Sequence, residues 1–122
     1  MSDSDHADDV AAAIEAAERW LPLADADDVA GSLAASAAVF RAVVGEEQWR
    51  ASLHRVRAAL GAVVEREYAT SRYTTQVPGA PDGEYVILEY ATELERKKEA
   101  VETVVMMRDP DGEWRVGGWF VK

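Results

Sequence analysis

The sequence predicts an α+β fold in which three N-terminal helices pack on one face of a curved four-stranded antiparallel sheet. Apolar residues recur at helical spacing over residues 8–60, whereas residues 63–121 have the Val-, Tyr- and Thr-rich composition of strands. The connections between the expected strands are short and rich in proline, glycine or charge, which makes neighbouring strands antiparallel. Helices grouped before strands are typical of the α+β class.

Three apolar stripes define the expected helices. The first helix is expected to begin at Asp8 or Asp9 and to kink or end near Pro22, because proline has no N–H to donate. The second is expected over residues 29–44 and should stop at the glycine that follows. The third is expected over residues 46–60 and has the cleanest helical periodicity in the chain.

Four strands are expected, over residues 63–76, 84–94, 100–108 and 113–121. Strict alternation in the fourth would place Trp114, Val116 and Phe120 on one face and Trp119 on the other. The third strand is apolar on both faces. That pattern is typical of a central strand covered on both sides, or of a strand in contact with another chain.

Length and composition indicate one domain. The chain has 122 residues, of which 48% are apolar and 30% charged, and this suits a single hydrophobic core. Residues 1–7 are small and polar, so we expect a disordered acidic tail followed by a single α+β domain over residues 8–122. Cysteine is absent, which excludes disulfides and thiolate chemistry.

The net charge of −10 is concentrated at one end of the sequence. Residues 1–40 hold nine acids against one base, whereas residues 41–122 hold 14 acids against 12 bases. A negative field repels phosphate backbones, so we expect no nucleic-acid partner. No apolar stretch approaches the roughly 20 residues of a membrane span. The chain as written is therefore expected to be soluble and cytoplasmic, or periplasmic or exported if a signal sequence has been removed.

Several segments resemble a bacterial family catalogued as domain of unknown function 4019. They include Arg57-Ala58-Ala59-Leu60-Gly61, the Pro-Gly-Ala-Pro-Asp-Gly-Glu-Tyr run at 78–85, and Asp-Gly-Glu-Trp-Arg-Val-Gly-Gly-Trp at 111–119. The likeness covers about residues 14–121 and departs from the family pattern at Leu33 and Trp119. The resemblance implies a cystatin-like or nuclear-transport-factor-like shape, often with a cone-shaped pocket, and a possible exported origin. It implies no catalytic residue, because the family has no assigned chemistry.

Two histidines and one arginine are the first candidates for a site, since histidine is the commonest general base near neutral pH. His6 falls in the expected tail, where nothing would hold it in place. His54 lies on the third expected helix beside arginines, and we interpret it as a surface residue. Arg57 is interpreted as an ion-pair partner that braces helix against sheet, with a functional contact to a buried carboxylate as the alternative.

Glu102 is the most suggestive carboxylate, because it lies in the middle of an otherwise apolar strand. If its side chain faces the core, it must pair with a cation or shift its pKa upward, since a lone buried charge is costly. The sequence offers Arg57 or Arg66 as that cation. A structural ion pair and a functional carboxylate would give the same pattern.

The acids Asp25, Asp27 and Asp28 are interpreted as turn and helix-cap residues. A calcium-binding EF-hand counted from Asp25 would need glycine and glutamate where the chain has Ala30 and Ser36. No histidine spacing is typical of zinc. We therefore expect no metal, no cofactor and no catalytic residue.

Three hypotheses of function are open at this stage. The leading one is a non-catalytic binding or accessory domain that holds an apolar small molecule or peptide between helices and sheet. The first alternative is a homodimeric interaction module that uses the sheet face around Tyr85, Ile87 and Trp119. The second is a small isomerase- or dehydratase-like enzyme with His54 or Glu102 in a cone-shaped pocket. The candidate ligand-binding residues are Trp20, Trp49, Arg57, Tyr90 and Glu102.

Overall fold

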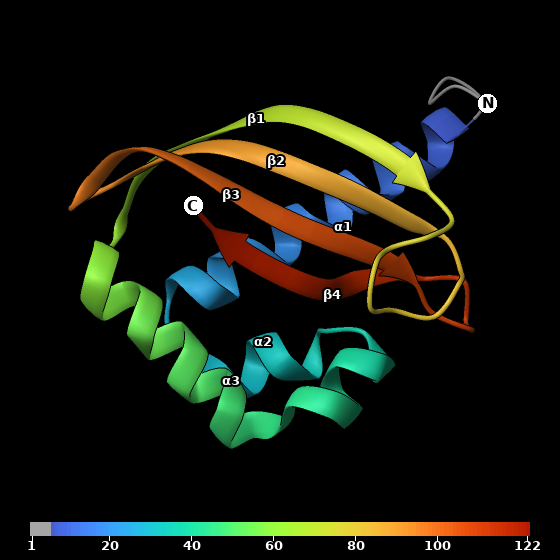
Figure 1. The fold of residues 1–122 in the computed structure, drawn as a ribbon, viewed down its shortest axis with the longest axis horizontal. Coiled ribbons are helices and arrows are strands. Elements are labelled where there is room, and N and C mark those ends of the chain that lie inside the picture. The colour runs from blue at the N-terminus through green and yellow to red at the C-terminus, as the bar shows by residue number, and fades with distance from the viewer. Residues whose placement is uncertain (1–5) are drawn as a thin grey trace.

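The computed structural model describes residues 6–122 as three helices followed by a four-stranded antiparallel sheet. Figure 1 shows α1 behind the sheet and α3 beyond its β4 edge, with β4 the strand nearest α2 and α3. The strand order β1-β2-β3-β4 follows the sequence order. The predicted α+β class is therefore confirmed. The elements are α1 (Ala7–Asp25), α2 (Val29–Ala34), α3 (Ala38–Leu60), β1 (Val63–Thr74), β2 (Tyr85–Leu94), β3 (Lys97–Arg108) and β4 (Trp114–Val121).

The start of the chain differs from the predicted tail. Residues 1–5 lie outside the described residues, but His6 precedes α1 directly as its N-cap residue. The His6 ring stacks on Tyr73 with 3.5 Å between ring centroids, and its Nδ1 atom lies 3.2 Å from Oδ2 of Asp9. The expectation that nothing holds His6 in place is therefore wrong.

The helix boundaries near residue 36 also differ from the prediction. The helix expected over residues 29–44 ends at Ala34, because the next residues leave the helix to reach the sheet edge. Ser36 forms a parallel bridge with Val116, and the amide of Ala37 donates to the Val116 carbonyl at 2.8 Å. The expected break at Gly45 is present as a kink inside α3, where φ is 72°. Proline does not end α1, which continues three residues beyond Pro22.

A β-bulge in β4 reverses the predicted facing of its last residues. Val105 pairs with Gly118 but Met106 pairs with Val116, which leaves Gly117 as an extra residue. Because of that insertion, Trp119 shares the helix-covered face of the sheet with Trp114 and is 8% exposed. Phe120 turns to the other face and is 58% exposed. The strict alternation predicted from the sequence is therefore wrong beyond Val116.

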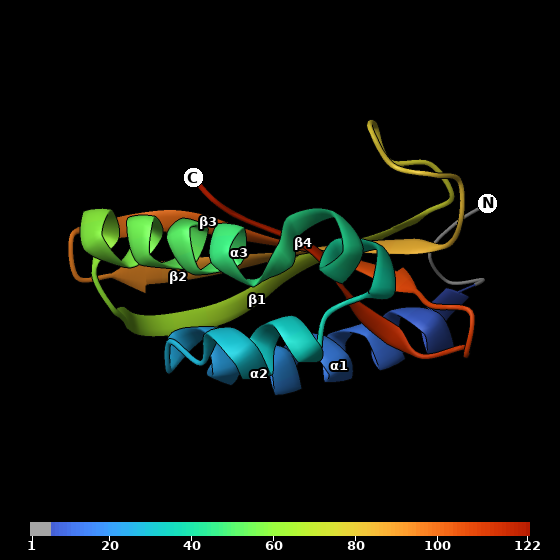
Figure 2. The same cartoon turned by 90° about the horizontal axis from the view of Figure 1, so that it is seen from below.

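The hydrophobic core lies between the helices and the sheet, and Figure 2 shows the same layers from below. Three indole rings meet there, with ring centroids 5.8 Å apart for Trp20 and Trp49 and 5.6 Å apart for Trp49 and Trp119. Buried serines satisfy two of the indole N–H groups: Trp20 donates to the Ser32 carbonyl at 2.9 Å, and Trp49 donates to the Ser32 hydroxyl at 2.8 Å. These rings fill the middle of the core, and a separate hollow of about 310 Å³ lies between α1 and β4.

The opposite face of the sheet is partly covered by the loop that joins β1 to β2. Tyr85 is 2% exposed because its hydroxyl donates to the carbonyl of Pro81 in that loop. The surface proposed for a dimer contact around Tyr85, Ile87 and Trp119 therefore loses two of its three residues to the interior. Among the described residues, no helix is long and apolar enough to cross a membrane.

Candidate functional site

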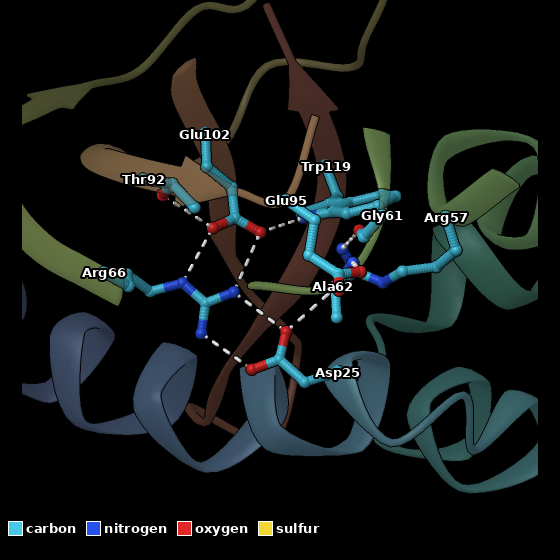
Figure 3. Close-up of polar contacts among 9 residues, drawn as sticks. All are labelled: Asp25, Arg57, Gly61, Ala62, Arg66, Thr92, Glu95, Glu102 and Trp119. Atoms are coloured by element: carbon cyan, nitrogen blue, oxygen red, sulfur yellow. Dashed lines mark hydrogen bonds and ion pairs between the residues drawn. The ribbon is translucent and has the colours of Figure 1, made fainter. Parts of the chain in front are cut away.

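A buried carboxylate lies at the centre of the sheet face that the helices cover. Glu102 is 2% exposed and accepts hydrogen bonds on both oxygens (Figure 3). Arg66 donates through Nε to Oε1 at 2.7 Å and through Nη2 to Oε2 at 3.2 Å. Thr92 donates its hydroxyl to Oε1 at 3.1 Å, and Trp119 donates Nε1 to Oε2 at 2.7 Å. The prediction that Glu102 needs a cation is confirmed, and that cation is Arg66.

Asp25 at the end of α1 links this carboxylate to α3. Arg66 binds Asp25 through two hydrogen bonds of 2.9 Å each, and Arg57 reaches the same carboxylate at 3.2 Å. The guanidinium of Arg57 also lies over the Trp119 ring, 5.8 Å from its centroid. Arg57 is therefore an ion-pair partner of a carboxylate, but that carboxylate is Asp25 of α1, so the pair joins two helices instead of bracing helix against sheet as predicted. We call these six residues the charge network: Asp25, Arg57, Arg66, Thr92, Glu102 and Trp119.

The two carboxylates of the charge network keep Arg66 charged. Burial alone would lower the pKa of Arg66, but its hydrogen bonds to Asp25 and Glu102, with the negative charges of both, raise the pKa above the ordinary value. Each oxygen of Glu102 accepts two hydrogen bonds, and all four come from residues of the charge network. The geometry therefore makes Glu102 a residue that positions Trp119 and Arg66, and it leaves neither oxygen turned toward an open cavity.

Side chains of the β2–β3 turn bind backbone groups at the C-terminal end of α3, beside the charge network. Arg96 donates to the carbonyls of Ala58 at 2.8 Å and of Arg57 at 3.2 Å, which satisfies carbonyls that the helix end leaves without partners. The Glu95 side chain accepts from the Ala62 amide at 2.7 Å. The C-terminal half of α3 is thereby held against the sheet by side chains from the β2–β3 turn.

Tyr90, another predicted ligand residue, lies next to Glu102 in the sheet and is 2% exposed. Its hydroxyl is buried and has no hydrogen-bond partner in residues 6–122. Burial, with the nearby charge of Glu18, raises the pKa of Tyr90 to about 12. Trp20, which was also predicted to bind ligand, is a core residue with its indole N–H already bonded, and it lines the hollow of about 310 Å³ between α1 and β4.

The second histidine lies away from these groups. His54 Nε2 is 3.0 Å from Oδ2 of Asp27, and both side chains are about half exposed. The pair is a surface contact between α3 and the loop after α1. Among the described residues, no cluster of three or more histidines and carboxylates is placed to hold a metal ion.

An open apolar groove of about 480 Å³ runs between α3 and β4, and we call it the α3–β4 groove. Its position follows from the bulge, because the bulge turns Trp119 inward and leaves Phe120 exposed beside it. Of the predicted ligand residues, only Trp49 lines it. The apolar lining side chains are Phe40, Val44, Trp49, Val56, Trp119, Phe120 and Val121, and the polar ones are Gln48, Ser52 and Arg55.

A smaller apolar pocket of about 190 Å³ lies on the other face of β4, beneath the β1–β2 loop. We call it the loop pocket. Its walls come from residues 77–81 of the loop and from Val105 and Met107 of β3. The α3–β4 groove and the loop pocket share Gly117, Gly118 and Phe120. The two hollows therefore flank the same short stretch of β4, which sequence reasoning missed because it did not foresee the bulge.

The charge network predicts a strong energetic coupling between Arg66 and Glu102. Arg66→Met should lower the free energy of unfolding by about 3–5 kcal/mol, because it leaves a buried carboxylate without its cation. Adding Glu102→Met to this variant should lower the free energy of unfolding much less than Glu102→Met does in the native protein. The coupling energy between the two residues should be about 1–3 kcal/mol. Urea denaturation of the four proteins measures this. The exposed pair Arg50 and Glu46 is the control, with a coupling below about 0.5 kcal/mol. A coupling as small as that of the control would contradict the assignment.

The unpaired hydroxyl of Tyr90 predicts a stabilising substitution. Tyr90→Phe removes a buried polar group without a partner, so the free energy of unfolding at pH 7 should rise by about 1 kcal/mol. The folded-state pKa of about 12 lies above the ordinary value of 10. Below pH 10 both states keep the phenolic proton, so the effect of Tyr90 on the free energy of unfolding does not change with pH. Between about pH 10 and pH 12 the unfolded state loses this proton first, and the free energy of unfolding falls. Denaturation at pH 7 and at intervals up to pH 12 should show a shallower alkaline decline in Tyr90→Phe. A less stable variant with an unchanged decline would refute this reading.

The family model described as "Protein of unknown function (DUF4019)" matches residues 16–119. Among curated proteins, none matches this chain. The matched range begins within α1 and ends at Trp119, so it contains the charge network and most of the α3–β4 groove. The resemblance found in the sequence is therefore confirmed, and the chain belongs to the family of proteins of unknown function DUF4019.

Proposed function

We propose that this chain is a non-catalytic binding domain that holds an apolar ligand or peptide segment in the α3–β4 groove. The observation that carries the proposal is Phe120, a large apolar side chain that is 58% exposed at the rim of an apolar groove. Exposed apolar surface gathered around a hollow is typical of binding sites.

The proposed site differs in place from the one first expected. Between helices and sheet the indole rings of Trp20, Trp49 and Trp119 occupy the interior. The groove lies at the rim of that interior, and Trp49 and Trp119 form its floor. Because Trp119 is fixed by Glu102 and Arg57, the charge network supports a rigid wall for a ligand. Rigid, preformed walls lower the cost of binding.

The other two hypotheses receive less support from the geometry. An enzyme would need Glu102 or His54 in a cavity, but Glu102 spends both oxygens on protein donors and His54 pairs with Asp27 at the surface. A dimer through the sheet face would need Tyr85 and Trp119 to be accessible, and both are buried.

The proposal predicts which substitutions remove binding of an apolar probe. The dye 1-anilinonaphthalene-8-sulfonate should bind the native protein with an affinity that falls about tenfold in Phe120→Ser, because that change removes most of one aromatic contact. Val44→Ser, on the opposite wall, should weaken binding in the same direction. Fluorescence titration measures the affinity, and thermal unfolding verifies that each variant is folded.

A matched control exists on the other side of the molecule. Val64 of β1 is 59% exposed and does not line the groove, so Val64→Ser should leave dye affinity unchanged. An equal loss in Val64→Ser and Phe120→Ser would show that the dye binds exposed apolar side chains in general. That result, or undiminished binding in Phe120→Ser, would count against the groove as the site.

A further inference from the structure

The outer edge of β4 presents backbone groups that have no partner within residues 6–122. Val101 and Lys122 exchange both of their backbone hydrogen bonds, at 3.0 and 2.9 Å. In an antiparallel ladder, hydrogen-bonded pairs alternate with non-bonded pairs. The backbone N–H and C=O groups of Phe120, two residues before Lys122, therefore also point toward β3. The N–H and C=O groups of Trp119 and Val121 therefore point away from β3. No residue in the described part of the chain bonds to them.

The same edge already accepts an extended segment a few residues earlier. The Val116 carbonyl receives the Ala37 amide at 2.8 Å, and Ser36 bridges to Val116 in parallel register. That contact ends where α3 begins at Ala38, and beyond it α3 and β4 separate to form the α3–β4 groove. The edge is thus covered at Val116 and, among the described residues, open at Trp119 and Val121.

Apolar hollows lie on both faces of this open edge. The α3–β4 groove flanks β4 on the helix side, and the loop pocket flanks it on the other side. Gly117 and Gly118, which belong to both, have no side chains to screen the strand backbone. Glycine in a strand commonly marks a place where another backbone approaches. A strand added about 4.8 Å from β4 would direct successive side chains alternately into the groove and toward the loop pocket.

Charge identifies one further feature of the occupant. Arg55 is the one charged residue that lines the α3–β4 groove. It contacts the Ser52 hydroxyl at 3.4 Å but forms no ion pair within residues 6–122. Arg41, Arg72 and Arg96 likewise have no ion pair among the described residues, so what distinguishes Arg55 is its place beside an apolar groove. An acidic side chain or a terminal carboxylate on the occupant would complement it.

The arrangement of α3 argues against a second copy of this chain as the occupant. Figures 1 and 2 show α3 alongside β4, beyond the edge of the sheet. If β4 paired with β4 of another copy, the two α3 helices would compete for the same space, because a helix is about 10 Å wide and paired strands are only about 4.8 Å apart. A single extended segment avoids this clash.

We propose that β4 receives an extended, apolar peptide segment of another protein as a fifth strand. Its backbone pairs with the N–H and C=O groups of Trp119 and Val121, its side chains alternate between the groove and the loop pocket, and an acidic group faces Arg55. This is the strand-addition mode of peptide recognition. The inference rests on the proposed function and specifies the class of ligand that the α3–β4 groove takes.

The test begins with a displayed library of random ten-residue peptides, selected on the native protein. The selected peptides should contain several consecutive apolar residues together with an aspartate, a glutamate or a free C-terminus. Their affinity should fall about fivefold in Arg55→Glu and be kept in Arg55→Lys. At saturating peptide, hydrogen exchange measured by NMR should slow at least about tenfold at the amides of Trp119 and Val121. The amide of Phe120, which faces β3, is the internal control and should change little.

Backbone methylation of the best peptide separates strand addition from other binding modes. Methyl groups on alternate nitrogens remove the donors that face β4 in one register and those that face away in the other. Strand addition predicts at least about a tenfold loss of affinity in one register only. If both registers bind alike, or if the Trp119 and Val121 amides stay unprotected, strand addition is wrong, although groove binding stands. If no peptide and no apolar dye depends on Phe120 and Val44, the proposed function fails as well.

Discussion

The buried carboxylate of Glu102 is the interaction on which the rest of this structure depends. A charge at 2% exposure would be strongly destabilising if it stood alone. Here it receives donors from Arg66 of β1, Thr92 of β2 and Trp119 of β4, so one side chain of β3 contacts every other strand. Through Arg66 the same charge reaches Asp25 at the end of α1. The cost of removing Glu102 from water is therefore offset by bonds that also fix how sheet and helices meet.

The orientation of Trp119 carries this constraint to the candidate site. Its indole N–H is committed to Glu102, and its ring lies under the guanidinium of Arg57. With Trp119 held on the inner face, the next residue, Phe120, must stand on the outer face. The groove floor, the exposed Phe120 at its rim and the open backbone edge all follow from the inward orientation of Trp119.

Part of this arrangement could be predicted from the sequence, and the reasons for success and failure are physical. Periodicity and turn chemistry are local, so the α+β class and the strand positions were accessible. A carboxylate in the middle of an apolar strand indicates a buried ion pair, which is why Glu102 and its need for a cation could be foreseen. The sequence could not choose between Arg57 and Arg66, because that choice depends on the strand order. In the sheet, β2 lies beside β3, and β1, which carries Arg66, lies beside β2.

The failures come from contacts between distant parts of the chain. Strict alternation ignores a bulge, and Gly117 forms one where a Cβ atom would lie 2.8 Å from the Met107 sulfur. The break before α3 depends on the Val116 carbonyl, which lies far away in sequence from Ala37. Asp25 was interpreted as a turn residue, since nothing local shows that two arginines converge on it. The groove was missed because its position follows from the bulge.

The most direct test of this account is hydrogen exchange at the indole N–H of Trp119, measured by NMR against the free energy of unfolding from urea denaturation. If the bond to Glu102 is the constraint described here, this proton exchanges only when the whole domain unfolds, and its free energy of opening equals the global value. Exchange through a local opening several kcal/mol below the global value, while the indole protons of Trp20 and Trp49 stay fully protected, would contradict the central place given to Glu102.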